Sequence, residues 1–191
     1  MRVLVFFLAL GSMALAQVPL PAVGKFPSIR VQVTVGTQER ALGDFYHKTM
    51  HIQPHVVIDG DNTMLPIPAA EAQLMIISSD TRAHYTYHKD AYKVLSTQTL
   101  PVPAALDGNR RQFNFETSDV TFDGYRDNSN VGGQMYKYYV FALRDAESKE
   151  ILDFETNDLE LLNYTKAHPE KRNEVLGVAK GAKFPTEFKA P

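Results

Sequence analysis

Histidine spacing is the feature of this sequence with the clearest chemical potential. His47, His51 and His55 recur every four residues, and His84 and His88 repeat the same interval. On a helix, this spacing would place neighbouring imidazoles on one face, ready for a metal ion. Both segments are predicted to be strands, however, and four strand residues span about 13 Å, whereas a Zn–N bond is about 2 Å long. A metal site would need His47 or His51 beside His84 or His88 on a neighbouring strand, so we expect a solvated strand face without metal.

No arrangement typical of a hydrolase is present. The sequence after residue 16 has no Cys and no G-x-S-x-G motif, and no spacing links a Ser to a His. Asp145 and Glu147 form a carboxylate pair, but they lie in a predicted turn, where solvation explains them. We therefore expect a protein that is not an enzyme and that holds no cofactor.

A polar, glycine-rich segment is the first candidate for a recognition site. Residues 122–133 form the most polar loop predicted in the chain, and binding residues concentrate on loops. Oxygen-bearing side chains could converge there, although polar loops are also ordinary in globular proteins. The candidate contact residues are Asp123, Tyr125, Asp127, Asn128 and Asn130.

A group of tyrosines is the second candidate. Tyr85 and Tyr87 would share one face of a predicted strand over residues 83–89, with Tyr92 nearby on the next strand. Exposed tyrosines could stack on sugar rings, which would make the protein a glycan- or small-ligand-binding module. Cross-strand aromatic pairs and core packing are more common roles, and the absence of Trp weakens the sugar interpretation. Both interpretations stay open at this stage.

The N-terminal residues have the pattern of a secretory signal. Arg2 supplies a positive charge, residues 3–10 are apolar, and Ala14-Leu15-Ala16 matches an A-x-A cleavage site. The apolar run is too short for a span of about 20 residues. We expect cleavage after residue 16, an extended leader over residues 17–27, and no transmembrane span in the remaining chain. The protein would then be exported to the periplasm, to the outer membrane surface or to the medium.

Composition limits the classes of partner. The chain carries 20 Lys and Arg against 22 Asp and Glu, and it has no Cys. No basic patch stands out, which argues against nucleic acid as a partner. Because no disulfide can form, an exported domain must be stabilised by its core, and residues 28–191 are enough for one core of adequate size.

The elements that must position these residues are mostly short strands. Residues 134–143 are apolar on both alternating faces, which predicts a strand near the middle of a sheet. A polar turn over residues 145–149 then leads to a return strand over residues 150–154. Residues 28–35 alternate between apolar and polar, as in an antiparallel strand with one solvated face. Further strands are predicted over residues 44–58, 72–78, 83–89, 92–99, 111–115 and 120–122.

A helix follows the strands. Asn157 would cap a helix over residues 158–168, which Pro169 would end. Eight or nine short strands at intervals of about 8–12 residues are typical of a sandwich or a barrel. We therefore predict a mainly β, antiparallel, Ig-like β-sandwich with a C-terminal helical segment, formed by a single domain over residues 28–191.

The C-terminal third resembles a known group of proteins. The run YYVFALRDAESKEILDF at residues 138–154, continued through the Leu-rich segment to Tyr164, is similar to small exported, Cys-free proteins of Verrucomicrobia, the Akkermansia group. This resemblance implies a cell-envelope protein with an Ig-like sandwich, in a group where some members are encoded near pilus-like machinery. It carries over no functional residues. Together with the residue patterns, it leads us to expect a non-enzymatic envelope or surface protein that binds a protein partner or assembles with itself.

Overall fold

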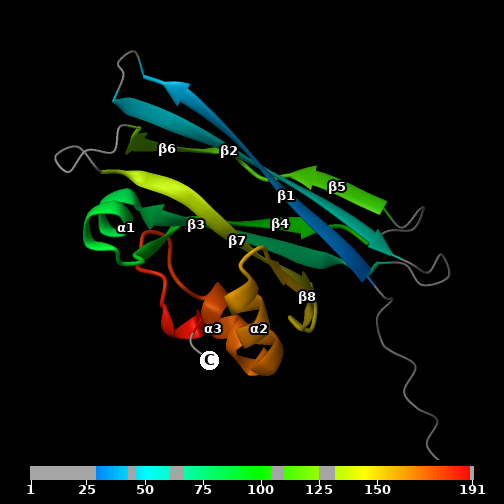
Figure 1. The fold of residues 1–191 in the computed structure, drawn as a ribbon. Coiled ribbons are helices and arrows are strands. Elements are labelled where there is room, and N and C mark those ends of the chain that lie inside the picture. The colour runs from blue at the N-terminus through cyan, green and yellow to red at the C-terminus, as the bar shows by residue number, and fades with distance from the viewer. Residues whose placement is uncertain (1–28, 43–45, 61–66, 105–109, 125–131, 190–191) are drawn as a thin grey trace, which may run out of the picture.

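Two antiparallel sheets lie face to face, and a layer of short helices covers the outer face of one of them (Figure 1). The structure is a computed structural model that describes residues 29–42, 46–60, 67–104, 110–124 and 132–189. One apolar cluster fills the space between the sheets, and a second lies under the helices. The predicted signal and leader, residues 1–27, lie outside the described residues.

The first sheet is organised around the long strand β2 (His47–Gly60). β1 (Ile29–Ala41) pairs with β2 along one side, while β5 (Arg110–Asn114) and β6 (Ser118–Asp123) share the other side. Pro54 within the strand region predicted over residues 44–58 indicates a bulge, an edge or a strand break, and β2 continues through it. The break falls in the neighbouring strand instead, because Pro54 has no N–H to donate and faces the gap between β5 and β6.

The second sheet has the strand order β4-β3-β7-β8. Its members are β3 (Ala70–Asp80), β4 (Tyr92–Val102), β7 (Gln134–Asp145) and β8 (Ile151–Thr156). The predicted central position of β7 is confirmed, since β7 pairs with both β3 and β8. Both of its faces are buried, as the apolar pattern predicts. Tyr139, Phe141 and Leu143 join the cluster between the sheets, and Tyr138, Val140 and Ala142 join the cluster under the helices.

The strand order identifies the type of sandwich. If β5 and β6 are counted as one interrupted strand, one sheet contains strands in the order β1-β2-β5/β6 and the other in the order β4-β3-β7-β8. Immunoglobulin-type sandwiches place strands A, B and E in one sheet and C, F and G in the other, with an added strand beside C in the variable type. The chain follows that order and crosses between the sheets after β2, β4 and β6. The predicted antiparallel, Ig-like β-sandwich is confirmed.

The C-terminal helical segment is also confirmed, with one correction at its start. α2 (Leu159–Ala167) is capped by Asp158, whose carboxylate accepts the N–H of Leu161, and not by Asn157. Asn157 instead accepts the N–H of Tyr139 at 2.9 Å, which ties the start of the helix to β7. A 3-10 turn (Pro169–Lys171), α3 (Arg172–Leu176) and a last 3-10 turn (Glu187–Lys189) complete the helical layer.

The segment predicted as a strand over residues 83–89 is a helix, and that prediction was wrong. α1 (Thr81–Tyr87) begins at Asp80, whose carboxylate accepts the N–H of Ala83 at 2.8 Å. It ends at His88, which has a positive φ of 49°. Within this helix only Thr81 is buried, so the apolar period of 3.6 that announces a helix is absent. Tyr85 and Tyr87 alternate with smaller residues, and this period of two is the pattern that wrongly predicted a strand.

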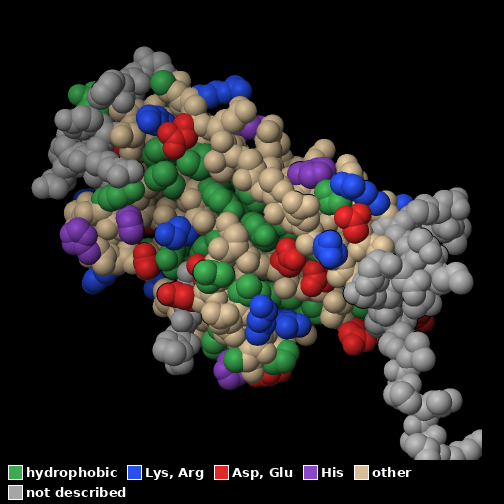
Figure 2. Space-filling model, turned by 45° about the vertical axis from the view of Figure 1, so that its right-hand side comes forward, with side chains coloured by type: hydrophobic (Ala, Val, Ile, Leu, Met, Phe, Trp, Pro, Cys, Tyr) green, Lys and Arg blue, Asp and Glu red, His purple; other side chains and the backbone are tan. Residues whose placement is uncertain are grey.

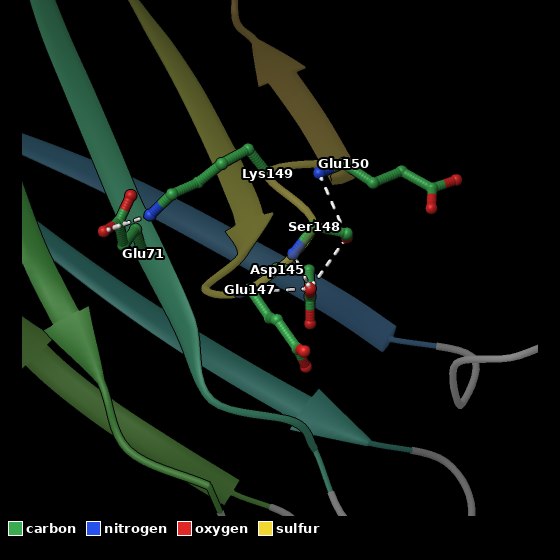
Figure 3. Close-up of polar contacts among 6 residues, drawn as sticks. All are labelled: Glu71, Asp145, Glu147, Ser148, Lys149 and Glu150. Carbon is green, nitrogen blue, oxygen red and sulfur yellow. Dashed lines mark hydrogen bonds and ion pairs between the residues drawn. The ribbon is translucent and has the colours of Figure 1, made fainter.

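A tight turn joins β7 to β8, as the polar run over residues 145–149 predicts (Figure 3). The buried carboxylate of Asp145 accepts the N–H groups of Glu147 and Ser148 and the hydroxyl of Ser148. Lys149 adopts a positive φ of 60° and donates to Glu71 of β3 at 2.8 Å. The turn is therefore fixed by its own side chains and by β3, and it sets the register of β8.

Candidate functional site

One side of the sandwich is open because two edge strands meet there. β1 is the last strand of the first sheet and β8 is the last strand of the second, and no strand within the described residues pairs with the outer edge of either. Cα atoms of β1 and β8 approach within 8 Å of one another. The unpaired N–H and C=O groups of an edge strand can receive a strand of another chain. We call the combined outer edges of β1 and β8 the open side.

The open side also leaves part of the apolar core accessible. Val33 and Val35 of β1, with Tyr136 of β7 and Leu152 of β8, pack against the cluster between the sheets but are only partly buried. In the space-filling view, hydrophobic side chains reach the surface in the middle of the molecule, flanked by charged side chains (Figure 2). A strand added here would bury apolar area in addition to pairing backbone groups.

Two carboxylates on β8 point into this region. Asp153 and Glu155 lie opposite Leu143 and Phe141 of β7, and directly opposed residues share a face of the sheet. Both carboxylates are therefore on the face turned toward the first sheet. Burial raises the pKa of Asp153. Burial and the neighbouring charge of Asp153 raise the pKa of Glu155 to about 7.

The two carboxylates have little compensation. One oxygen of Asp153 is buried and has no hydrogen-bond partner among the described residues. The nearby cation Arg172 makes other contacts. Its guanidinium lies 5.6 Å from the ring centre of Phe154, and its Nε donates a hydrogen bond to the backbone carbonyl of Thr165 in α2. Asp153 and Glu155 themselves line a shallow pocket of about 350 Å³, together with Leu162 and Lys166 of α2.

We predict that replacing Glu155 by Gln stabilises the protein at alkaline pH. The pKa of Glu155 in the folded protein, about 7, lies above its ordinary value of 4.5, so ionisation of Glu155 destabilises the fold above pH 7. The destabilisation decreases as the pH falls from 7 toward 4.5, because Glu155 becomes protonated in the folded protein. The full shift corresponds to about 3 kcal/mol, which solvent screening of a partly exposed group reduces to roughly 1–2 kcal/mol. Urea unfolding should therefore show a more stable E155Q variant at pH 8 and a much smaller difference at pH 5.

Glu150 provides the control for this measurement. It precedes the same strand, but it is exposed, so E150Q should leave the free energy of unfolding nearly unchanged at both pH values. If E155Q is no more stable than E150Q at pH 8, the carboxylate of Glu155 does not destabilise the folded protein.

The opposite side of the sandwich is better protected. The C-terminal segment pairs with the first part of the β4 edge: Val94 donates its N–H to the carbonyl of Ala182, and Phe184 donates its N–H to the carbonyl of Tyr92. Further along β4, the side-chain amide of Gln98 bonds both the N–H and the carbonyl of Glu116, at 2.7 and 2.9 Å. The edge formed by β5 and β6 is short and interrupted, which disfavours pairing with another chain.

The structure does not bring the candidate histidines of the two segments together. His47 and His51 lie on the outer face of the first sheet, where each meets a carboxylate of β6. His47 Nε2 is 3.6 Å from Asp123 Oδ1, and His51 Nδ1 is 2.6 Å from Asp119 Oδ1. Imidazoles held in this way are typical of a solvated, hydrogen-bonded strand face.

His84 and His88 belong to α1 and its end, not to a strand beside β2. His84 Nδ1 lies 3.6 Å from Asp90 Oδ1, and His88 adopts the left-handed conformation that ends the helix. Within the described part of the chain, no group of three or more His, Asp or Glu side chains could hold a metal ion. The interstrand cluster that a metal site would require is not formed by these four histidines.

The tyrosines do not form a common platform. Tyr85 and Tyr87 lie on α1, and Tyr87 is 57% exposed. Tyr92 is a core residue of the helix-side cluster, and its ring packs edge-on against Tyr138 at 5.7 Å between centroids. The expectation of a shared strand face for Tyr85 and Tyr87 fails because the segment is helical.

The predicted recognition loop is described only at its ends. Asp123 is the last residue of β6, and its N–H donates to the carbonyl of Gly132 at 2.9 Å. The other candidates, Tyr125, Asp127, Asn128 and Asn130, lie outside the described residues.

Sequence reasoning missed the carboxylate pair on β8. The available signal was the alternation of Asp153 and Glu155 with Leu152 and Phe154 in and just after the return strand predicted over residues 150–154. Acidic residues on alternate positions normally indicate a solvated face, and only the pairing of β8 with β7 shows that this face is turned inward.

Comparison with known proteins yields only loose structural likeness. No family model matches the chain. No curated protein matches it either. A crystal structure from Akkermansia muciniphila is 12% identical with a TM-score of 0.31, covering 69% of this chain and 72% of that one. An X-ray structure of a Northeast Structural Genomics Consortium target is also 12% identical with a TM-score of 0.27, covering 69% of this chain and 89% of that one. Neither match assigns a family or a function.

Proposed function

We propose that this protein is an exported, non-enzymatic binding module that joins a protein partner, or another copy of itself, through the open side. The observation that carries the proposal is the pair of unpaired edges, β1 and β8, with partly exposed core residues between them. Strand addition uses both features, because backbone pairing supplies affinity and alternate side chains supply specificity.

The cellular setting is part of the same proposal. The signal pattern in residues 1–16 supports export, to the periplasm, the outer membrane surface or the medium. In the described residues, no helix is both long enough and apolar enough to cross a membrane. The resemblance of residues 138–164 to envelope proteins of the Akkermansia group supports an envelope role, including association with a pilus.

The chemistry of the open side favours association over catalysis. Its side chains are mainly aliphatic and aromatic, with two carboxylates, and Thr156 and Lys166 complete the pocket at β8. The Thr156 hydroxyl donates to the carbonyl of Tyr139, and no imidazole lines that pocket among the described residues. The alternative function, glycan binding by Tyr85, Tyr87 and Tyr92, loses its main support because Tyr92 is buried in the core.

The proposal predicts that a lysine placed on the inner face of β1 abolishes association. Val35 points toward the cluster between the sheets and is partly buried, so V35K would put a charge where an added strand must pack. The measurement is native co-purification from the envelope fraction, with light scattering for the mass of the assembly. We expect a partner or a defined homo-oligomer with the unaltered protein, and its loss with V35K.

Thr34 gives a matched control. It is the neighbouring residue of the same strand, but it is exposed on the outer face of the first sheet, so T34K adds the same charge without entering the proposed interface. Far-ultraviolet circular dichroism and urea unfolding establish that both variants are folded. A V35K variant that is folded and still assembles as T34K does would contradict the proposed interface, and so would a bare monomer without partner from the native envelope.

A further inference from the structure

We propose that the segment received at the β8 edge is basic, and that it places a Lys or Arg side chain between the sheets against Asp153 and Glu155. This inference rests on the proposed function, since it names the chemistry of the partner that the open side receives. It commits to one occupant, an extended cationic peptide segment of a protein partner.

The register of β8 fixes where such a cation would lie. Asp153 and Glu155 are two residues apart on a strand, so their Cα atoms are about 7 Å apart on the same face. A strand paired with the outer edge of β8 would place every second side chain on that same face, with directly opposed Cβ atoms about 5 Å apart. A long Lys or Arg side chain at such a position reaches both carboxylates.

The burial of the pair is what makes a cationic partner favourable. Taking carboxylates out of water is costly unless a counter-charge and hydrogen bonds compensate. Here the carboxylates are already half-buried, and one oxygen of Asp153 has no hydrogen-bond partner in the described part of the chain. A partner cation would add to the limited counter-charge that Arg172 supplies, while most of the desolvation cost is already present in the free protein. An acidic segment would instead meet two like charges.

Neighbouring charges on the adjacent elements do not remove this preference. Arg172 lies on the helical side, over the ring of Phe154. Its charge lowers the pKa of Asp153 but is outweighed by burial. Lys166 of α2 lines the same pocket as Asp153 and Glu155, but it is exposed. On β1, Arg30 alternates with the inward-facing Val31 and is exposed. The face turned toward the first sheet therefore presents net negative charge at β8.

A competing explanation assigns the pair a purely protective role. Inward-pointing charges on an edge strand block unwanted strand pairing. The two explanations predict opposite effects of neutral side chains. If Asp153 and Glu155 only guard the edge, the D153N/E155Q variant gains self-association. If they recognise a cation, the same variant loses affinity for a basic strand.

The test uses two synthetic peptides of about nine residues with the same alternating pattern of Val and a charged residue, one with Lys and one with Glu. Binding to the purified protein is followed by NMR through the amide signals of Ile151–Thr156. At pH 8 we expect the Lys peptide to bind at least tenfold more tightly than the Glu peptide, and D153N/E155Q to reduce that preference about tenfold. The preference should also decline between pH 8 and pH 5.5 in the unaltered protein but not in the double variant.

Equal binding of the two peptides, or an unchanged preference for the Lys peptide in D153N/E155Q, would overturn the inference. Increased self-association of the double variant without loss of Lys-peptide affinity would establish the protective role in its place. The V35K and T34K comparison separates these outcomes from the proposed function. If V35K abolishes native assembly while the peptides show no charge preference, the open side is still the interface. Only the inference that the partner segment is basic would then be wrong.

Discussion

Replacing Phe184 by Ala should lower the free energy of unfolding by about 3–5 kcal/mol. Its side chain is fully buried in the cluster under the helices. The ring packs edge-on against Tyr138 and Phe188, at 6.0 and 5.8 Å between centroids. Truncation leaves a cavity that neighbouring aromatic rings cannot fill. Urea or thermal unfolding of F184A measures the loss directly.

Lys183 is the matched control for this residue. It lies next to Phe184 in the segment that pairs with β4, but its side chain is exposed. K183A should change the free energy of unfolding by less than about 0.5 kcal/mol. A loss below 1 kcal/mol in F184A would show that the C-terminal segment is not part of the folded core.

Replacing Asp145 by Ala should cost about 2–3 kcal/mol, because hydrogen bonds to a buried charged group are among the stronger ones. The carboxylate oxygen accepts the Ser148 N–H at 2.6 Å, the Ser148 hydroxyl at 2.7 Å and the Glu147 N–H at 3.2 Å. Without it, the turn loses the acceptor that organises its backbone (Figure 3). Chemical unfolding measures the cost.

Glu147 is the control within the same turn. Its N–H takes part in the network, but its side chain is exposed, so E147A keeps the backbone donor and should be nearly neutral. If D145A and E147A have the same stability, the turn is held by backbone geometry alone.

Much of the β architecture could be predicted from local patterns. The apolar residues on both faces of β7 predicted a position inside a sheet, because a strand with two apolar faces must be covered on both sides. The alternation in residues 29–35 correctly gave one buried and one solvated face for β1. Patterns of this kind depend only on period and burial, which the sequence records directly.

Features that depend on capping or on distant contacts could not be predicted in the same way. α1 forms because Asp80 caps it, in a surface segment without apolar periodicity. Asp158 caps α2 in place of Asn157, because the side chain of Asn157 accepts the N–H of Tyr139, 18 residues earlier in the sequence. Phe184 lies in a Lys-rich C-terminal stretch without apolar periodicity, yet it is buried because residues 181–184 pair with the β4 edge.

The candidate site belongs to this second class. Whether a strand is an edge depends on the pairing of the whole sheet, so neither the open side nor the inward direction of Asp153 and Glu155 follows from local sequence. Histidine and tyrosine side chains can bind metals or sugars, but their spacing predicts which of them share a face only when the secondary structure is known. The segment around residues 81–88 is a helix and not the predicted strand, so the faces expected for its histidines and tyrosines were wrong.

Amide hydrogen exchange of the natively purified assembly, compared with the isolated protein, tests the central claim most directly. Strand addition at the open side predicts slower exchange in β1 (Ile29–Ala41) and β8 (Ile151–Thr156), with little change in β5 and β6. Protection confined to β4, β5 and β6, with β1 and β8 exchanging as in the isolated protein, would contradict the open side as the binding surface.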